Sequence, residues 1–270
     1  MTLSPNTIND VLIIKVGTST LVKKASDGSE SLDIESFHRI GQQIAALQDE
    51  GRHVILVTSA SITAGMLETD IALRPSRKEN MIELQRLSAV GWRSILNAWS
   101  DSIGDRTVAS LLITKHELDP ASQERREVLA TIHTMLTHGD LPVANENDPI
   151  THEEIEFGDN DTLAATLAAR IGSSDLFSSN VKLVLLSDVD GVYKDINNSQ
   201  SLINTVEDLT ELDHLAGPPI SMSGTGGMTT KFAAAKIATR AGVDMWLANG
   251  KESNAIQKTL RGEIGTHFPS

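Results

Sequence analysis

The sequence has no cysteine, and only 3% of its 270 residues are aromatic. The lack of cysteine excludes disulfides, thiolate metal sites and cysteine nucleophiles. Long apolar runs are also missing, because stretches such as "VLII" and "LVLL" are far too short to cross a bilayer. The first ten residues lack the basic-then-apolar pattern of a signal peptide. These absences predict a cytoplasmic protein that does not bind membranes.

Clusters of basic residues are absent as well. The chain carries 23 Lys and Arg against 36 Asp and Glu, a net charge of −13. A surface this acidic repels nucleic acid unless a basic patch intervenes, and pairs such as Arg125-Arg126 are too short to form one. The composition therefore predicts no nucleic-acid partner. The histidines show no metal-ligand spacing, and no G-x-S-x-G hydrolase motif occurs.

Apolar runs and helical periodicity alternate along the chain. The runs expected to form strands are 11–17, 53–59, 107–114, 141–145, 181–188, 243–249 and 264–268. The segments expected to form helices are 32–51, 79–99, 123–136, 161–171, 229–242 and 252–262. Strands without polar alternation, separated by helices, predict an α/β fold with a mostly parallel sheet covered on both faces.

Small polar or charged residues follow the predicted strands. They form the stretches "KVGTS" (15–19), "TSAS" (58–61), "NEND" (145–148) and "SD" (187–188). Because ligands of open parallel sheets lie beyond the carboxyl ends of the strands, these stretches predict one site at that edge.

Two lysines stand beside glycine-containing turns. Lys15 ends an apolar strand just before Gly17, and Lys231 follows the loop that contains Gly226 and Gly227. Each lysine could bind a phosphate group together with backbone N–H groups and a helix N-terminus. Taken alone, the patterns are equally compatible with a strand-end lysine that reaches solvent and a glycine-rich surface turn.

Three polar residues, Asp159, Asn160 and Asp161, lie at the start of a predicted helix. A single Asp or Asn there is well explained as an N-cap. Three exceed what a cap needs, so Asn160 could hydrogen-bond a substrate and Asp161 could hold two lysines in place. Carboxylates in this region could also share Mg²⁺ with phosphate groups.

Seven strings in order resemble the amino acid kinase family. They are "IKVGTS", "VTSASITAG", "PVANENDPIT", "FGDNDTLAA", "LLSDVDGVY", "GTGGMTTK" and "AGVDMWLANG", and they span nearly the whole chain. The resemblance implies a three-layer αβα sandwich with a mostly parallel central sheet. Within one domain, residues 1–175 would form the phosphate-acceptor lobe and residues 176–270 the nucleotide lobe.

The likeness is strongest to members that transfer the γ-phosphoryl group of ATP, with Mg²⁺, to the side-chain carboxylate of L-glutamate. The product, glutamyl 5-phosphate, belongs to the first step of proline biosynthesis. A carboxylate is already a nucleophile at neutral pH, so the protein needs to supply only alignment and charge neutralisation.

The resemblance also assigns roles to single positions. Lys15 and Lys231 would flank the phosphoryl group, and Asp161 would orient the two lysines. Ser59, Asp148 and Asn160 would contact glutamate. The positions implied for ATP binding are Lys15, Ser187, Asp188, Thr225, Gly226, Gly227, Met228, Thr229, Thr230 and Lys231.

One position departs from the family pattern. The family usually has glycine after the second-strand "TS", where this chain has Ala60 followed by Ser61. If the position needs a positive φ, alanine would lower the activity or change the acceptor. Two alternatives to glutamate phosphorylation therefore stay open. One is another carboxylate, carbamate-like or phosphate acceptor, for which the basic stretch 74–80 could supply charge unless it is a solvated acceptor-side loop. The other is a binding regulator without turnover.

The family further implies a homo-oligomer, either a dimer or a tetramer, and possible feedback inhibition by proline. Many bacterial members continue into a PUA-type domain associated with RNA binding. Because the sequence stops soon after "IGTHF", we expect a kinase domain alone.

Overall fold

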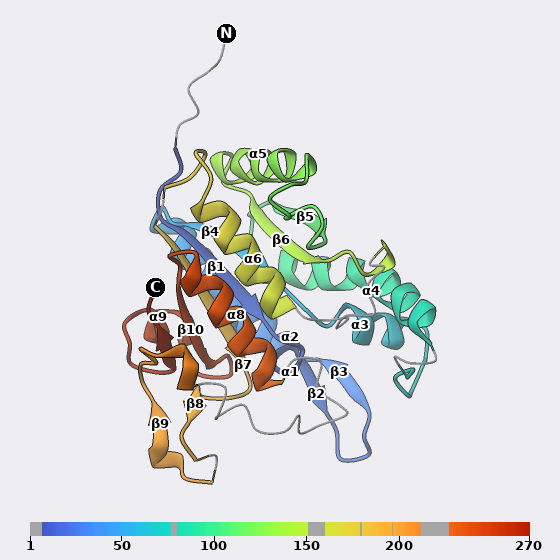
Figure 1. Cartoon of the computed structure of the whole chain (residues 1–270). Helices are drawn as coiled ribbons and strands as arrows, with labels where there is room; N and C mark the ends of the chain where they lie inside the picture. The colour runs from blue at the N-terminus through green and yellow to red at the C-terminus, as the bar shows by residue number, and fades with distance from the viewer. Residues whose placement is uncertain (1–6, 77–79, 151–159, 179, 196, 212–226) are drawn as a thin grey trace.

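A seven-stranded sheet forms the centre of the molecule (Figure 1). The computed structural model describes residues 7–76, 80–150, 160–178, 180–195, 197–211 and 227–270. In spatial order, the strands are β11 (Thr266–Phe268), β10 (Asp244–Asn249), β7 (Val181–Ser187), β1 (Val11–Val16), β4 (His53–Val57), β6 (Leu141–Glu146) and β5 (Val108–Ile113). All neighbours pair in parallel except β10 and β11, which are antiparallel.

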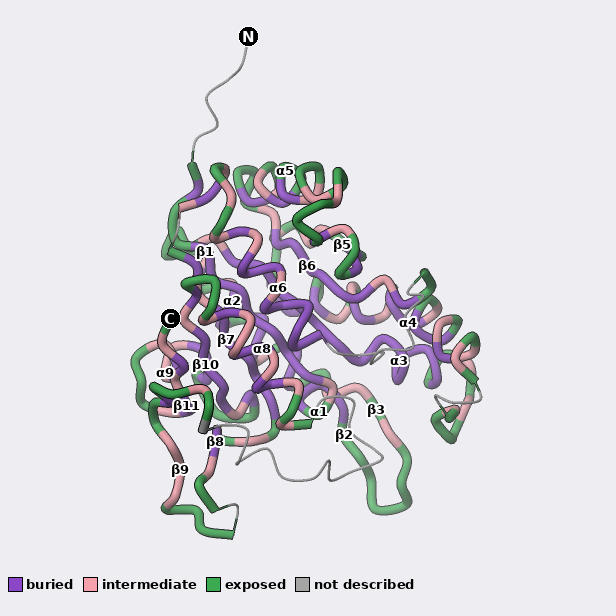
Figure 2. Tube along the Cα trace, viewed as in Figure 1, coloured by how far each residue is buried: buried purple, intermediate pink, exposed green. Residues whose placement is uncertain are grey.

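Helices cover both faces of this sheet, as the sequence predicts. One apolar core joins it to α5 (Glu124–Thr137), α6 (Asn160–Gly172) and α8 (Met228–Arg240). The other joins it to α2 (Ile34–Asp49), α4 (Met81–Ser102) and α9 (Ala255–Leu260). The residues of β1 alternate between the two cores, with Val11 and Ile13 in one and Leu12 and Ile14 in the other. The buried segments in Figure 2 accordingly run through the centre of the molecule. The expected three-layer αβα sandwich is confirmed.

Short elements surround the sheet. They are the helices α1 (Thr18–Leu21) and α3 (Ser61–Glu68), the strand pairs β2 (Val22–Lys24) with β3 (Glu30–Leu32) and β8 (Val192–Tyr193) with β9 (Leu202–Ile203), and the 3₁₀ turns η1 (Asp148–Ile150), η2 (Ser199–Ser201) and η3 (Leu209–Glu211). No helix in the described ranges is long and apolar enough to cross a membrane.

Four parallel strands bring their carboxyl ends to one edge. They are β7, β1, β4 and β6, which are consecutive neighbours in the sheet. The polar stretches that follow these strands therefore meet, although the first, at 15–19, and the last, at 187–188, are about 170 residues apart in sequence. Since β1 lies between β4 and β7, one sheet contains strands from both sides of residue 175. The division into two lobes at that residue stays a prediction.

Candidate active site

Lys15 lies at the centre of the sheet edge. Its backbone pairs with Val57 of β4 and Leu185 of β7, and only 6% of its surface is exposed. A buried ammonium group is costly unless a counter-charge accompanies it. Asp161, the second residue of α6, supplies that charge through an ion pair with Lys15 Nζ.

Asp161 also holds the second lysine. Lys231 Nζ, on the first turns of α8, lies 3.3 Å from Asp161 Oδ2, and the Thr230 hydroxyl donates to the same oxygen at 2.9 Å. Both lysines and the aspartate are buried. The carboxylate thus binds the two ammonium groups on its two oxygens, as expected for a residue that orients both lysines.

The charges of Lys15 and Lys231 determine the ionisation of Asp161. Burial alone would raise its pKa, because it disfavours the charged form, but Lys15 and Lys231 outweigh that effect and lower the pKa from 3.8 to about 2. Asp161 is therefore a carboxylate throughout the physiological pH range. One negative charge against two ammonium groups leaves an excess positive charge, which suits an anionic phosphoryl group.

Asn160, the residue before Asp161, forms hydrogen bonds to the ends of β4 and β6. Its amide donates to Thr58 O at 2.7 Å, to Asn145 Oδ1 at 2.8 Å and to Ser59 Oγ at 3.2 Å, while its carbonyl accepts from Glu146 N at 3.2 Å. These bonds join α6 to the ends of β4 and β6. Asn160 and Ser59, two of the predicted acceptor contacts, therefore lie together; their contact with a substrate stays a prediction.

Asp148, the third predicted acceptor contact, is held by a chain of hydroxyl groups. Ser88 of α4 donates to Asp148 Oδ2, Ser61 Oγ lies 3.0 Å from Ser88 Oγ, and Asn145 Nδ2 donates to Ser61 at 3.3 Å. All four residues are buried. Ser88 could not be predicted from the sequence, because a single serine on an apolar helix carries no motif.

Two glycines allow the close crossing of α3 and α4 on which this chain depends. A Cβ atom at Gly91 would lie 2.0 Å from Ser61 O, and one at Gly65 would lie 1.9 Å from Leu87 O. Both distances are far below van der Waals contact, so neither position accepts a side chain. Gly65 and Gly91 therefore permit the close packing of α3 against α4.

Ala60 adopts the left-handed conformation, with φ 77° and ψ 5°, at the N-cap of α3. The sequence left open whether position 60 needs a positive φ, and the structure shows that it does. A residue with a Cβ atom pays roughly 1–2 kcal/mol for this conformation, whereas glycine does not. The alanine remains buried between Ser59 and Ser61, which places backbone strain directly beside the predicted acceptor contacts.

The predicted nucleotide residues lie at the ends of β7 and α8. Ser187 Oγ donates to Asp188 Oδ1 at 3.1 Å. Partial desolvation would raise the pKa of Asp188, but the hydroxyls of Ser19 and Ser187 and the charge of Lys231 lower it. Gly227 caps α8, whose first residues, Met228, Thr229 and Thr230, lead to Lys231. Thr225, Gly226 and Asp159 lie outside the described residues.

A cavity of about 30 Å³ lies between the ends of β4 and β6 and the starts of α3 and α6. It is lined by Thr18, Ser59, Ala60, Ser61, Ile62, Arg74, Asn145, Asp148 and Asn160. All three predicted acceptor contacts are among them. Arg74 also lines the cavity, although it was not among the predicted acceptor contacts. The sequence did identify the basic stretch to which it belongs.

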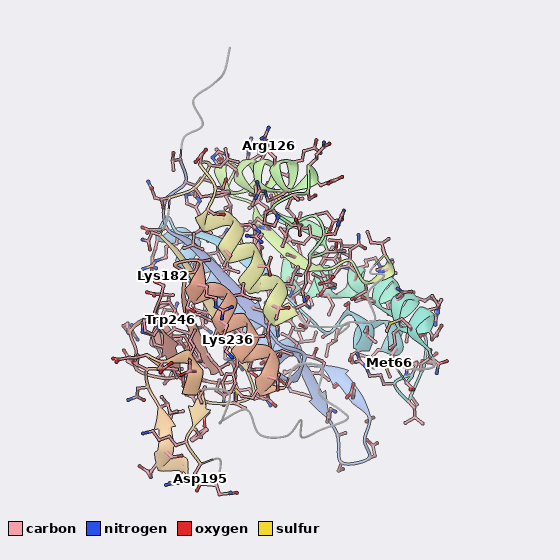
Figure 3. All side chains as sticks on the ribbon, in the orientation of Figure 1. Met66, Arg126, Lys182, Asp195, Lys236 and Trp246 are labelled. Atoms are coloured by element: carbon pink, nitrogen blue, oxygen red, sulfur yellow. The ribbon has the colours of Figure 1, made fainter. Side chains whose placement is uncertain are left out.

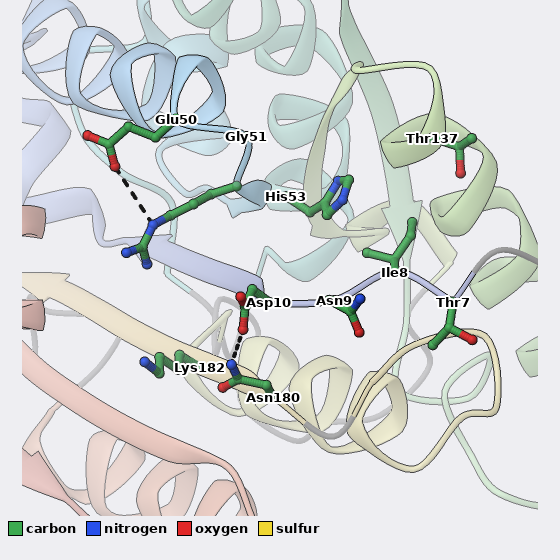
Figure 4. A pocket seen from close by; sticks show the side chains of 11 residues that line it. Thr7, Ile8, Asn9, Asp10, Glu50, Gly51, His53, Thr137, Asn180 and Lys182 are labelled. Atoms are coloured by element: carbon green, nitrogen blue, oxygen red, sulfur yellow. Dashed lines mark hydrogen bonds and ion pairs between the residues drawn. The ribbon is translucent and has the colours of Figure 1, made fainter.

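A larger cavity of about 620 Å³ lies at the opposite, amino-terminal end of the sheet (Figure 4). Its lining includes Asp10, Arg52 and Asn180, each of which directly precedes a strand. Arg52 Nε lies 3.8 Å from Glu50 Oε2, and Asn180 donates to Asp10. The charged groups of Asp10, Glu50 and Arg52 thus lie beside internal partners. The residues that the sequence assigns to chemistry converge at the other end, so we place the active site there despite the smaller volume.

The chain belongs to the amino acid kinase family, whose profile matches residues 10–249. Two solved structures share its fold: a carbamate kinase from Giardia (TM-score 0.61, 16% identity, 97% of this chain and 99% of that one) and a UMP kinase from Bacillus anthracis (TM-score 0.62, 14% identity, 96% of both chains). At such identities, the likeness concerns the fold alone.

Curated relatives of much higher identity carry one name, glutamate 5-kinase. The relative from Symbiobacterium thermophilum is 38% identical over 95% of this chain and 95% of its own length. The relative from Clostridium acetobutylicum is 39% identical over 95% of this chain and 93% of its own. A Thermoanaerobacter relative is also 38% identical, and the match covers 67% of its length.

Proposed function

We propose that this chain phosphorylates the side-chain carboxylate of L-glutamate with ATP, the activity named for its relatives, and so catalyses the first step of proline biosynthesis. The observation that carries the proposal is the Lys15–Asp161–Lys231 arrangement beside the cavity that contains Ser59, Asp148 and Asn160. The relatives support glutamate as the acceptor, because they match nearly the full chain at 38–39% identity.

The chemistry requires alignment rather than proton transfer. The γ-carboxylate of glutamate attacks the γ-phosphorus of ATP, the new C–O–P linkage forms, and the bond to the β-phosphate oxygen breaks to release ADP. Negative charge gathers on the transferring oxygens in the transition state. Lys15 and Lys231 stabilise that charge from fixed positions, because Asp161 prevents the two ammonium groups from reorienting.

Mg²⁺ fits the nucleotide end of this site. In kinases, it retains several waters and binds through one or two carboxylates together with substrate phosphates. We propose that Asp188 faces this ion, since its pKa is lowered and it lies at the end of β7. Asp161 is a poor ligand, because both of its oxygens already bind lysines. When bound, Mg²⁺ neutralises charge on the phosphates of ATP.

The acceptor end needs no general base, because the attacking carboxylate is already a nucleophile at neutral pH. Asn160, Ser59 and Asp148 are neutral or anionic hydrogen-bonding groups that suit an amino acid. We propose that they position glutamate so that its side-chain carboxylate points towards Lys15. The two-lobe division at residue 175, homo-oligomer formation and inhibition by proline are further proposals, which rest on the family resemblance.

One assay tests the function. The protein is incubated with ATP, Mg²⁺ and L-glutamate, and the acyl phosphate is trapped with hydroxylamine; parallel reactions contain aspartate, N-acetylglutamate or UMP. We expect hydroxamate with glutamate alone. Turnover of another acceptor alone would contradict the choice of glutamate, and binding without any turnover would indicate a regulator. Adding proline to the same assay tests feedback inhibition.

A further inference from the structure

The acceptor cavity contains one residue of each charge among its described lining residues. Asp148 is the acid and Arg74 is the base, and the other seven are uncharged. If the acceptor carried only carboxylate groups, the cavity would have no use for the negative charge of Asp148. An α-amino acid, in contrast, carries an ammonium group and a carboxylate on the same carbon, and therefore matches the pair.

Asp148 is a fixed charge. It is 4% exposed, and the Ser88 hydroxyl donates to Oδ2 while Ser61 positions Ser88 from the other side. A carboxylate accepts up to about four hydrogen bonds, so the bond from Ser88 leaves capacity for a substrate ammonium group. The hydroxyl chain therefore sets where a cationic group of the acceptor can bind.

Arg74 is a different kind of lining residue. It is exposed, on the segment between α3 and α4, and it precedes Pro75, which favours an extended backbone at position 74. A guanidinium group presents paired N–H donors that match the two oxygens of a carboxylate. At about 30 Å³, the cavity is comparable to the volume of one water. Admitting an amino acid therefore requires a movement, and an exposed loop residue moves more readily than the buried strand-end residues opposite it.

We propose that Arg74 determines acceptor specificity by binding the α-carboxylate of the amino acid, while Asp148, held by Ser88, binds its α-ammonium group. This inference rests on the proposed function, because it names how the same site recognises its acceptor. The side-chain carboxylate of the bound amino acid then faces Lys15 and Lys231. The site then selects free α-amino acids over analogues that lack either α-group.

The test compares L-glutamate with 4-aminobutyrate, which retains the carboxylate to be phosphorylated but has no α-carboxylate. Both compounds are assayed with the wild type, Arg74→Gln and Arg74→Lys. If 4-aminobutyrate binds without turnover, its inhibition constant replaces KM. Arg126→Gln is the matched control, because Arg126 is an exposed arginine on α5, far from Met66 of α3 beside the acceptor region (Figure 3).

We expect Arg74→Gln to raise the KM for glutamate by about 10–100-fold, since a charged partner is lost from a partly exposed pair, and to change kcat by less than about 3-fold. The constant for 4-aminobutyrate should not change. Arg74→Lys should recover part of the loss, because it restores the charge without the paired donors. Arg126→Gln should behave as the wild type.

Equal effects of Arg74→Gln on the two compounds, or no effect on either, would overturn the inference while glutamate turnover by the wild type still supported the proposed function. If the wild type fails to phosphorylate glutamate, the proposed function fails, and the same comparison is made with dissociation constants measured by calorimetry. A wild type that neither binds nor phosphorylates glutamate would overturn both.

Discussion

At the phosphoryl end of the site, three buried charges from β1, α6 and α8 meet, and Asp161 holds Lys15 and Lys231 through ion pairs. At the acceptor end, the contacts are mostly hydrogen bonds between uncharged groups, and two glycines bring α3 and α4 close enough for Ser61 to reach Ser88. In the proposed mechanism, charge neutralisation therefore requires few residues in fixed positions, whereas acceptor recognition depends on how closely two helices pack. The first end should be sensitive to charge and the second to small changes in volume and backbone conformation.

Removing the shared carboxylate should have the largest effect. In Asp161→Asn, two buried ammonium groups lose their counter-charge, so we expect the free energy of unfolding to fall by about 3–5 kcal/mol. Chemical denaturation measures this change. Asp101→Asn, an exposed aspartate at the end of α4, is the matched control and should be nearly neutral. A loss as small as that of the control would contradict the charge-based account of this end.

The same variant makes a pH-dependent prediction. The pKa of Asp161 is lowered to about 2, so its stabilising contribution is fully present above pH 3.8 and is lost as the pH falls towards 2. The wild type should therefore lose about 2 kcal/mol of unfolding free energy from this group over that interval, and Asp161→Asn should not. Parallel denaturation curves at several acidic pH values test the difference; identical pH dependence in the two proteins would refute the assignment.

Lys231→Met should chiefly impair the chemical step. One fixed donor to the transition state is lost, so kcat should fall by about 10²–10³-fold while the KM for glutamate changes little. Lys236→Met, five residues further along α8 (Figure 3), is the control on the same helix and should retain activity. An effect on KM alone would show that Lys231 acts in binding and not in phosphoryl transfer.

At the acceptor end, Ser88→Ala removes the hydroxyl that donates to Asp148. Asp148 would then be held less firmly, and the KM for glutamate should rise by about 3–10-fold with kcat nearly unchanged, as expected for the loss of one charge-assisted hydrogen bond. Ser102→Ala removes a hydroxyl that donates to Ala98 O of the same helix, and it should leave KM unchanged. A fall in kcat instead of a rise in KM would contradict a role in positioning Asp148.

The smallest effect concerns Ala60. Glycine relieves the left-handed strain, so Ala60→Gly should raise the free energy of unfolding by about 0.5–1 kcal/mol, the net of strain relief and the greater entropy of unfolded glycine. Ala64→Gly, in the interior of α3, should lower it by about 1 kcal/mol or more. If both substitutions destabilise the protein to the same extent, the backbone at position 60 is not strained.

The sequence was most informative where a single residue type carries the chemistry. Uninterrupted apolar strands predicted the parallel sheet. Lys15, Asp161 and Lys231 could be identified because the resemblance to the family assigns a role to each of them, whereas the local sequence around the two lysines is equally compatible with a solvent-exposed lysine and a surface turn. Ser88 could not be identified, since its role comes from the crossing of α3 with α4 and not from its neighbours in sequence. Nor could the sequence alone give the conformation of Ala60, because alanine is the residue that normally avoids a positive φ.

The most direct test of the account is a crystal structure with ADP, Mg²⁺, L-glutamate and aluminium fluoride, which mimics the transferring phosphoryl group. We expect the Nζ atoms of Lys15 and Lys231 on two sides of the fluoride group, each about 3 Å from a fluorine, with the glutamate side-chain carboxylate in line opposite ADP. A structure in which either ammonium group lies more than about 6 Å from the fluoride, beyond any direct contact, would contradict it.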